Sequence, residues 1–229
     1  MRLDKFITEC TELTRSQAKR ALILGEVQVN GSLQRDASYK VQPADEVFWQ
    51  EQRLSLRGQR YIMLHKPEGY ICSTVGEVHE SVLALLQVDK RQSLHIAGRL
   101  DVDTTGLVLI TDDGQWSHRV TSPKRLCEKR YQVQLADPLS GDEVAHFAAG
   151  IQLHNEDKPC LPARLEVLGT HQAQLWLQEG KYHQVKRMFA ALGNRVVALH
   201  RDQIGAIRLD PALAPGQWRY LTVEEVAAV

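Results

Sequence analysis

The spacing of apolar residues in the first 55 positions predicts a small unit of two helices followed by a hairpin sheet. Thr14, with Gln17 three residues later, has the form of a capping box, and Gly25 marks the end of the helix that it starts. The apolar side of this helix is formed by Ala18, Ala21, Leu22 and Leu24. Val27–Val29 then alternates before a tight-turn Asn-Gly pair, and Glu46–Gln50 is a further strand.

From Arg60 onward, short runs of β-forming residues and helical segments follow one another in no regular order. Strands are expected at Tyr61–Leu64, Leu107–Thr111, Tyr131–Leu135, Ala163–Val167 and Ala173–Leu177. Helices are expected at Ser81–Leu86, Gln115–Thr121, Gly141–Ala149 and His183–Leu192. Because the steady strand–helix repeat of a doubly wound sheet is missing, the pattern favours an α+β fold on a mixed, mainly antiparallel sheet. The polar stretch Glu51–Gln59 is the expected linker, which gives domains at residues 1–55 and 56–229.

Composition narrows the class of protein further. The chain has 229 residues, 43% of them hydrophobic and 24% charged, which are ordinary values for a globular protein. Leu107–Ile110 lies in one of the longer apolar runs, far short of the ~20 residues of a membrane span. The chain starts without the apolar block of a signal peptide, so export is not expected. The four cysteines are scattered, which fits reduced thiols in the cytoplasm better than a disulfide scaffold or a zinc site.

The chain has 28 basic and 28 acidic residues and is neutral overall, but its charges are unevenly distributed along the sequence. Two segments are strongly basic: residues 115–131 with Arg119, Lys124, Arg125, Lys129 and Arg130, and residues 180–201 with Lys181, Lys186, Arg187, Arg195 and Arg201. The first contains Glu128 as its one acid, and the second contains none. One such run is commonly a solvated surface, but two that flank the same candidate site favour a polyanionic partner.

Gly98–Gly106 is the densest cluster of polar, turn-forming residues, and it leads directly into the apolar run that starts at Leu107. This order places two carboxylates, Asp101 and Asp103, at the rim of a sheet, where backbone contacts can hold an acid that faces a cleft. From composition alone, a surface turn whose aspartates cap their own backbone explains the segment equally well.

The segment around Asp101 resembles the active-site signature of a known enzyme family. Arg99-Leu100-Asp101 is similar to the signature of the A branch of the small-subunit pseudouridine synthases. Further segments resemble motifs of that family in the same order: His65–Tyr70, Lys129–Tyr131, Glu179–Met188 and Leu199–Gly205. At the start of the chain, Arg2–Phe6 together with Val29–Gly31 is similar to the S4-type RNA-binding fold. The resemblance covers nearly the whole chain.

The resemblance implies that the chain isomerises a specific uridine, uridine 516 of 16S ribosomal RNA, to pseudouridine. This reaction breaks the N1–C1′ bond of a base that has left its stack, and rejoins the base through C5. Asp101 would be the catalytic acid, which either attacks covalently or removes a ribose proton, and Lys186 would keep it ionised. Many relatives carry arginine at this position, so a lysine is a small departure from the family pattern. Tyr131 would pack on the flipped base and carry a proton.

The RNA contacts that the resemblance and the basic segments imply involve Arg15, Lys19, Arg20, Lys66, Arg99, Lys129, Arg130, Lys181, His183 and Arg187. Arg99 is hypothesised to bind phosphate or to fill the space that the flipped base leaves. The sequence has no phosphate loop, nicotinamide fingerprint or metal-ligand spacing, so we expect neither a cofactor nor a metal. The expected partner is 16S ribosomal RNA or an assembly intermediate of the small subunit, with no membrane contact. We expect the protein to act as a monomer.

Several of these residues also have a simpler structural interpretation. Structural roles are expected for Asp103, Asp112 and Asp113 in turns, for Lys66 in a turn near the site, and for Trp116 and His118 in packing or RNA contact. For Lys181 and His183, binding to phosphate and simple solvation are equally consistent with the sequence.

Three other functions fit parts of the sequence. A non-enzymatic RNA-binding protein of the same fold would make Asp101 dispensable. An S4-bearing RNA methyltransferase would need a glycine-rich nucleotide loop after a strand, which the sequence lacks. A relative specific for the large ribosomal subunit fits Ser81–Gln92 and the basic helix less well than the small-subunit enzyme does, by resemblance.

Overall fold

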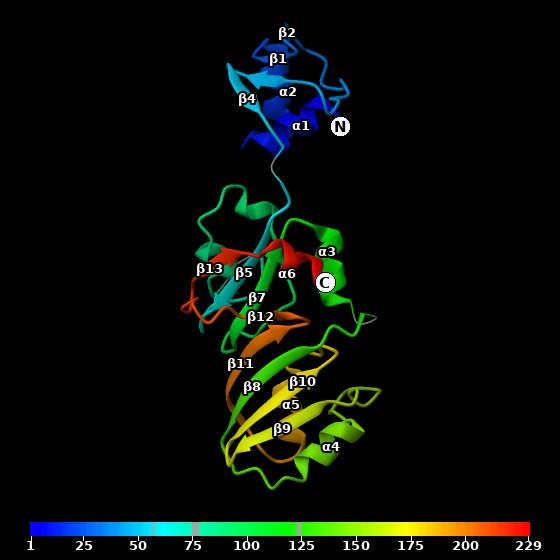
Figure 1. Ribbon diagram of the computed structural model, residues 1–229, viewed down its shortest axis with the longest axis vertical. Coiled ribbons are helices and arrows are strands. Elements are labelled where there is room, and N and C mark those ends of the chain that lie inside the picture. Colours follow the sequence, from blue (N-terminus) through cyan, green and yellow to red (C-terminus); the bar gives the residue numbers. More distant parts are fainter. Residues whose placement is uncertain (57, 75–77, 123–124) are drawn as a thin grey trace. The chain divides into compact units, whose positions relative to one another are not determined.

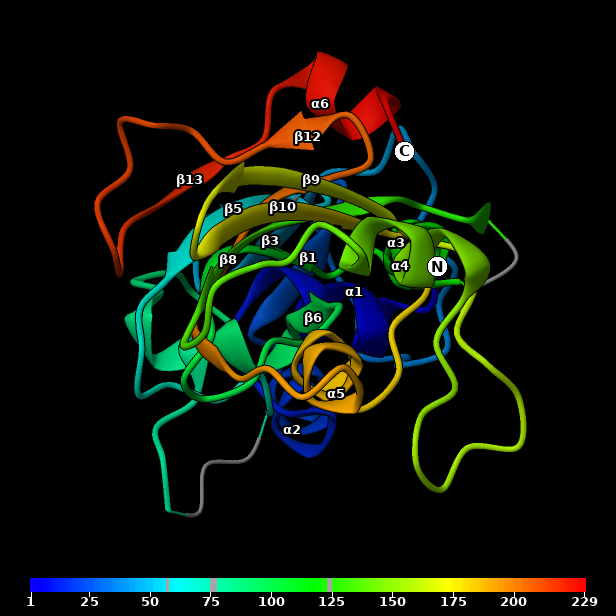
Figure 2. The same ribbon diagram turned by 90° about the horizontal axis from the view of Figure 1, so that it is seen from below.

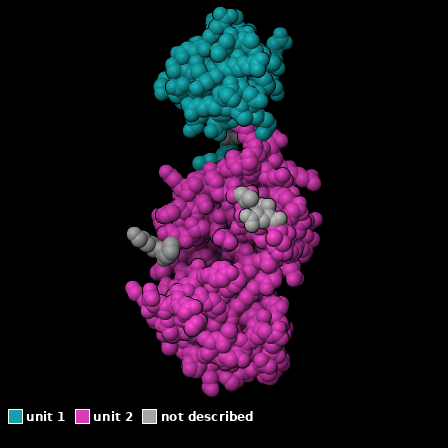
Figure 3. Space-filling model, turned by 180° about the vertical axis from the view of Figure 1, so that it is seen from behind, with its two compact units in different colours: residues 1–59 teal, residues 60–229 magenta. Residues whose placement is uncertain are grey.

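The computed structural model describes residues 1–56, 58–74, 78–122 and 125–229. The chain divides into two compact units, Met1–Gln59 and Arg60–Val229 (Figure 3). Each unit has its own hydrophobic core. Lys124, which belongs to the first basic segment, lies outside the described residues.

The first unit combines two helices with a four-stranded antiparallel sheet of strand order β2-β1-β3-β4 (Figure 1). Its elements are α1 (Leu3–Cys10), α2 (Arg15–Ile23), β1 (Val27–Val29), β2 (Ser32–Leu33), β3 (Val47–Trp49) and β4 (Gln52–Leu54). The predicted capping box is present: the Thr14 side chain accepts from the Gln17 amide, and Gln17 Oε1 accepts from the Thr14 amide at 2.8 Å. Asn30 and Gly31 both have positive φ, as the predicted tight turn requires.

Strand β4 lies inside the segment that the sequence predicts as a linker. Leu54 is buried and pairs in register with Val47 of β3. Gln50 and Glu51 have φ values of 48° and 66°, so a tight turn without glycine reverses the chain before β4. The linker prediction is therefore wrong for the residues of β4, because one apolar residue in three is too weak a pattern to indicate a strand.

The second unit is built on a nine-stranded mixed sheet, in which seven strands follow the order β13-β5-β7-β11-β8-β10-β9 (Figure 1). These strands are β5 (Tyr61–Lys66), β7 (Thr105–Thr111), β8 (Lys129–Leu135), β9 (Arg164–Gly169), β10 (Gln172–Leu177), β11 (Val196–Ile204) and β13 (Trp218–Tyr220). Outside this path, β6 (His95–Ala97) pairs with β7 and β12 (Ile207–Arg208) pairs with β11. Among the described strands of this sheet, β7 and β11 pair in parallel and the other pairs are antiparallel. The predicted α+β class is confirmed.

The helices of this unit are α3 (Gly114–Thr121), α4 (Glu143–Ala149), α5 (Gln184–Ala191) and α6 (Val223–Ala227), with the 3-10 turns η1 (Val82–Leu85) and η2 (Arg91–Ser93). Three predicted helices correspond to α3, α4 and α5, with ends that agree to within two residues. The predicted helix at Ser81–Leu86 is the 3-10 turn η1 instead. Its amides bond three residues back, from Ala84 to the Ser81 carbonyl and from Leu86 to the Leu83 carbonyl, so the turn is too short to become an α-helix. Every helix among the described residues is too short or too polar to bridge a lipid bilayer.

Strand β7 is apolar at consecutive positions because both of its faces are covered. Val108 and Ile110 belong to the core that contains Phe189 of α5, whereas Leu107 and Leu109 belong to a second core with Trp116 of α3. Figure 2 shows α5 on one side of the sheet and α6 on the other. A strand with one solvated face would alternate polar and apolar residues; a doubly covered strand does not.

Candidate active site

A cavity of about 1010 Å³ in the second unit brings together the segment before β7, strand β8 and the start of α5. Asp101, Tyr131 and Lys186 all line this cavity, as do Arg99 and His183. The three predicted catalytic residues come from separate parts of the chain, and the fold of the sheet gathers them around one space.

Lys186 connects the two aspartates of the segment before β7. Its Nζ lies 3.2 Å from Asp101 Oδ2 and 2.5 Å from Asp103 Oδ1. His183 Nε2 lies 3.4 Å from the other carboxylate oxygen of Asp101, Oδ1. The Asp101 side chain is 27% exposed, so its carboxylate is held by basic groups and still reaches the cavity. The interpretation of Asp103 as a turn cap needs correction, since its carboxylate bonds Lys186 of a distant helix.

Burial and charge act in opposite directions on this cluster. Burial disfavours the Lys186 ammonium, but the hydrogen bonds and the charges of Asp103 and Asp101 together raise the pKa of Lys186. Burial also disfavours the Asp103 carboxylate, but the hydrogen bond and the charge of Lys186, together with smaller contributions, lower the pKa of Asp103. Lys186 is therefore cationic beside Asp101 at neutral pH.

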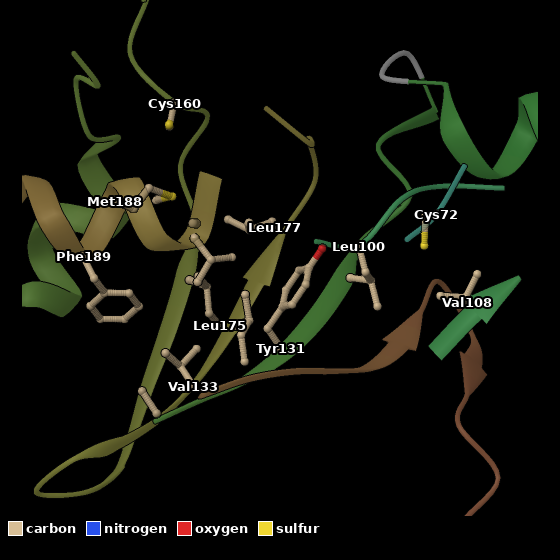
Figure 4. Close-up of a cluster of buried hydrophobic side chains, with 14 of the residues drawn as sticks. Cys72, Leu100, Val108, Tyr131, Val133, Cys160, Leu175, Leu177, Met188 and Phe189 are labelled. Carbon is tan, nitrogen blue, oxygen red and sulfur yellow. The ribbon is translucent and has the colours of Figure 1, made fainter. Parts of the chain in front are cut away.

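Tyr131 supplies an aromatic wall to the same cavity. It lies on β8 and is 8% exposed. Figure 4 shows its ring between Leu100 and Leu177, with the hydroxyl end directed away from the sheet. An aromatic ring set among apolar side chains offers a surface on which a flat base can pack, next to a carboxylate.

Arg201 is a buried cation of this site whose role the sequence does not reveal. It is 2% exposed and lies in register with Tyr131 on the neighbouring strand β11. Its Nε donates to the Leu107 carbonyl at 3.0 Å, and its Nη1 donates to the Arg99 carbonyl at 3.3 Å. Its Nη2 is buried and has no hydrogen-bond partner among the described residues. Arg201 thus ties the segment that carries Asp101 to β11, the strand beside Tyr131. In the sequence, only its position in a basic segment indicated that Arg201 could belong to the site.

The Lys66 side chain is also buried, which contradicts its predicted contact with RNA. The residue is fully buried, and its Nζ donates to three carbonyls, those of Pro67, Val102 and Thr104, at 3.0, 3.2 and 2.7 Å. Burial lowers the pKa of this ammonium. Lys66 therefore fixes the backbone on both sides of Asp103, in agreement with the alternative of a structural turn.

Other cations predicted to bind RNA have partners inside the protein. Arg130 forms a two-point pair with Asp202, at 2.8 and 3.0 Å. Lys181 and Arg187 both pair with Glu156, at 3.2 and 2.8 Å. For these three residues the RNA contact stays a prediction, and the structure adds that their charges also join segments of the protein itself. The sequence could not reveal this, since Asp202 and Glu156 lie outside the two basic segments.

The remaining cations differ in their accessibility. Lys129 Nζ donates to the Cys127 carbonyl at 2.9 Å and burial lowers its pKa, although the residue lines the cavity. Arg99, Lys19 and Arg20 are exposed. Arg15 is exposed but pairs at 3.2 Å with the buried carboxylate of Asp4. Arg99, Lys19 and Arg20 are thus the predicted RNA-binding cations that are most accessible to an external anion.

The residues for which the sequence predicts structural roles near the site are held in place by side-chain bonds or by burial. Asp113 caps α3 by accepting from the amides of Gln115 and Trp116, and Asp112 pairs with Arg60 at 2.7 Å. Trp116 is fully buried in the core, as the packing interpretation expects. In the part of the chain that the structure describes, no group of three or more His, Cys, Asp or Glu side chains could hold a metal ion.

A carboxylate beside a half-buried ammonium and an aromatic wall, in a basic cavity, suits an enzyme that acts on a nucleobase, and comparison with known proteins agrees. The sequence model of RNA pseudouridylate synthase matches residues 60–191, and that of the S4 domain matches residues 1–47. The chain belongs to the RNA pseudouridylate synthase family and carries an S4 domain in front of the catalytic domain. The alternatives of a non-enzymatic RNA-binding protein and of a methyltransferase are not supported.

Full-length relatives are about half identical to this chain. It is 53% identical to "Ribosomal small subunit pseudouridine synthase A" of Vibrio cholerae, over 100% of this chain and 99% of that protein. The proteins of that name from Salmonella typhimurium and Escherichia coli are 53% and 52% identical, over 100% of both chains. A solved structure titled "Crystal structure of pseudouridylate synthase" is 48% identical, with a TM-score of 0.73 over 100% of this chain and 99% of the other.

Proposed function

We propose that this enzyme converts one uridine of small-subunit ribosomal RNA, uridine 516 of 16S ribosomal RNA, to pseudouridine. The observation that carries the proposal is the Asp101 carboxylate, held 3.2 Å from the Lys186 ammonium in a cavity that Tyr131 also lines. The choice of small-subunit RNA over large-subunit RNA is supported by full-length relatives at 53% identity whose names specify the small ribosomal subunit.

Asp101 would start the reaction from its ionised form. Isomerisation breaks the bond between N1 of uracil and C1′ of ribose, and then forms a bond from C5 to C1′; C5 loses its proton and N1 gains one. A carboxylate can attack C1′ as a nucleophile, or it can remove a ribose proton as a base. Both routes need a negative charge on Asp101, and the Lys186 ammonium lies 3.2 Å from its Oδ2.

Tyr131 would hold the base while it is detached from the sugar. A base that has left its stack must be held by other contacts, because flipping costs a few kcal/mol. The Tyr131 ring, supported by Leu100 and Leu177 (Figure 4), can pack on the uracil face, and its hydroxyl can carry a proton. We assign binding of the base to Tyr131, and we assign stabilisation of the reactive acid to Lys186.

The S4 domain would bind the RNA outside the target uridine. Arg15, Lys19 and Arg20 lie on α2, one to five residues apart, and are exposed. Exposed cations at this spacing contact phosphates, which position an RNA without reading its sequence. We propose that a monomer acts in the cytoplasm on 16S ribosomal RNA or on an assembly intermediate of the small subunit, with the S4 domain at residues 1–55 and the catalytic domain at residues 56–229.

Mapping of modified uridines tests this function. Ribosomal RNA from cells that lack this chain is treated with carbodiimide and copied by primer extension, which stops at pseudouridine. We expect the stop at position 516 to be missing, and to return when wild-type protein is supplied. Asp101→Asn should leave the stop missing although RNA binding survives, since an amide can neither attack C1′ nor remove a proton.

The matched control is Asp142→Asn, because Asp142 is an exposed aspartate that does not line the cavity. This variant should restore the stop as well as the wild type does. A stop that persists in cells without the chain would contradict the proposed target, and a stop restored by Asp101→Asn would remove Asp101 from the mechanism. Loss of a stop in large-subunit RNA instead would favour the large-subunit alternative.

A further inference from the structure

Tyr182 is an exposed aromatic residue at the edge of the active-site cavity. Its side chain belongs to the cavity lining, yet the residue is 73% exposed. One face of its ring is stacked on the imidazole of His183, with ring centroids 3.8 Å apart and an angle of 20° between the planes. His183 in turn lies 3.4 Å from Asp101. Asp101, His183 and Tyr182 therefore form a short chain of contacts that leads from the carboxylate in the cavity to the surface of the protein.

The backbone around this stack is fixed by several bonds. His183 has a φ of 47°, a left-handed conformation that is uncommon for residues other than glycine. Arg187 Nη1 donates to the Tyr182 carbonyl at 3.1 Å and to Glu156 at 2.8 Å. Lys181, on the other side of Tyr182, donates to the same Glu156 at 3.2 Å. The Tyr182 ring is thus presented to solvent on a braced segment, and the face opposite His183 is open.

A nucleotide that leaves its stack uncovers the faces of the bases on either side of it. Aromatic side chains compensate for such losses in RNA-binding proteins, because stacking works with any base. We propose that the open face of Tyr182 stacks on a nucleobase that flanks the target uridine while that uridine occupies the cavity. The proposal rests on the proposed function only in requiring a flipped uridine in an RNA chain, whichever position that uridine has.

Another exposed tyrosine shows what an ordinary surface position looks like in this protein. Tyr220 on β13 is 51% exposed and contacts Trp218 edge-on, at a centroid distance of 5.5 Å. It does not line the cavity. Tyr220→Ala removes the same chemical group from the surface and is therefore the matched control for Tyr182→Ala.

The test combines protein variants with changes in the RNA. The substrates are 16S ribosomal RNA, free and in a reconstituted small-subunit particle, with an abasic nucleotide placed either directly before or directly after the target uridine. Dissociation constants and single-turnover rates are measured for the wild type, Tyr182→Ala, Tyr182→Phe and Tyr220→Ala. We first require that the wild type modifies the intact substrate, so that failure of the proposed function is recognised separately.

Tyr182→Ala should weaken binding of the intact substrate by about 5- to 150-fold, the range expected for one stacked base. The rate on bound RNA should fall less than the affinity does, and Tyr182→Phe should recover most of the affinity, since it keeps the ring. Removing the base at one of the two flanking positions should weaken the wild type by a similar factor and should weaken Tyr182→Ala no further.

Three results would overturn the proposal. If the effects of Tyr182→Ala and of the missing base multiply at both flanking positions, the side chain and the base do not contact each other. If Tyr182→Phe is as defective as Tyr182→Ala, the hydroxyl and not the ring face carries the effect. Equal defects in Tyr182→Ala and Tyr220→Ala would also contradict it, because only the first of these residues lines the cavity.

Discussion

The Lys186 ammonium makes its shortest ion-pair contact with Asp103, at 2.5 Å, although Asp103 is the more exposed of its two carboxylate partners. Asp103 therefore decides where the cation lies relative to Asp101. In the proposed mechanism this arrangement separates two tasks: one aspartate would react, and its neighbour two residues later would orient the lysine beside it.

Asp103→Asn tests this division of tasks. Because the Asp103 side chain is 54% exposed, the charged hydrogen bond that it forms with Lys186 should contribute only about 1 kcal/mol. We expect the rate on bound RNA to fall about fivefold. Single-turnover kinetics measure this rate, and a loss as complete as that of Asp101→Asn would mean that Asp103 itself takes part in the reaction.

Lys186→Met should have a larger effect. It leaves two carboxylates in the cavity with His183 as the basic group closest to Asp101, so the reacting charge loses its main electrostatic support. Removing one preorganised group of this kind lowers a rate by on the order of 100-fold. Lys186→Arg should retain more activity than Lys186→Met, and a loss below threefold in the methionine variant would show that another cation supports Asp101.

Lys66→Met distinguishes a structural lysine from an RNA contact. The variant removes the ammonium donor from the carbonyls of Pro67, Val102 and Thr104, of which Val102 keeps the Gly69 amide, so we expect the free energy of unfolding to fall by about 2 kcal/mol. The dependence of RNA affinity on salt should stay the same, since Lys66 touches no phosphate. In Lys19→Ala the slope of log affinity against log salt should instead decrease by roughly 0.7. Denaturant unfolding and binding titrations in several salt concentrations check both; a changed slope in Lys66→Met would contradict this interpretation.

The stability of the first unit should depend on acid pH through Asp4. The carboxylate is fully buried, and the hydrogen bond from Arg2, joined by one from Arg15, holds its pKa below the ordinary value of 3.8 although burial opposes this. A lowered pKa in the folded state stabilises the fold above the ordinary pKa, and this contribution is lost as the pH falls toward the folded value. Asp4→Asn should therefore destabilise the unit by roughly 2 kcal/mol at neutral pH.

The difference between wild type and Asp4→Asn should shrink once the pH drops below about 4, which unfolding curves at several pH values measure. Asp142→Asn serves again as the control, because Asp142 is exposed. A difference between Asp4→Asn and wild type that does not change with pH would show that the amide fails through packing and not through charge.

Local patterns were enough to predict much of the fold. The capping box at Thr14, the Asn-Gly turn and the apolar run of β7 depend on neighbours in the sequence, and they form as predicted. Strand β4 was missed because its one buried residue gives no periodicity. The order of strands in the large sheet depends on contacts between distant segments, which a single sequence does not contain.

The sequence was enough to predict which residues form the candidate site, but not which partners its charged residues have. Motif resemblance selected Asp101, Tyr131 and Lys186, and all three line one cavity. The bonding partners of the basic residues could not be inferred, because a count along the chain treats every lysine and arginine as free. Arg130 and Asp202 illustrate this: they meet only because β8 and β11 are neighbours in the sheet.

The parallel junction between β7 and β11 has a consequence for the precision of the site. Two register pairs join these strands, one of them Gly106 with Arg201, and a Cβ on Gly106 would lie 2.1 Å from the Arg201 carbonyl oxygen. Asp101 precedes one strand, whereas Tyr131 is paired with the other. A slip of one residue at this seam would displace the acid from the aromatic wall by about 3.3 Å, more than the length of a hydrogen bond. The missing side chain of a single glycine thus permits the close approach that aligns the two halves of the candidate site.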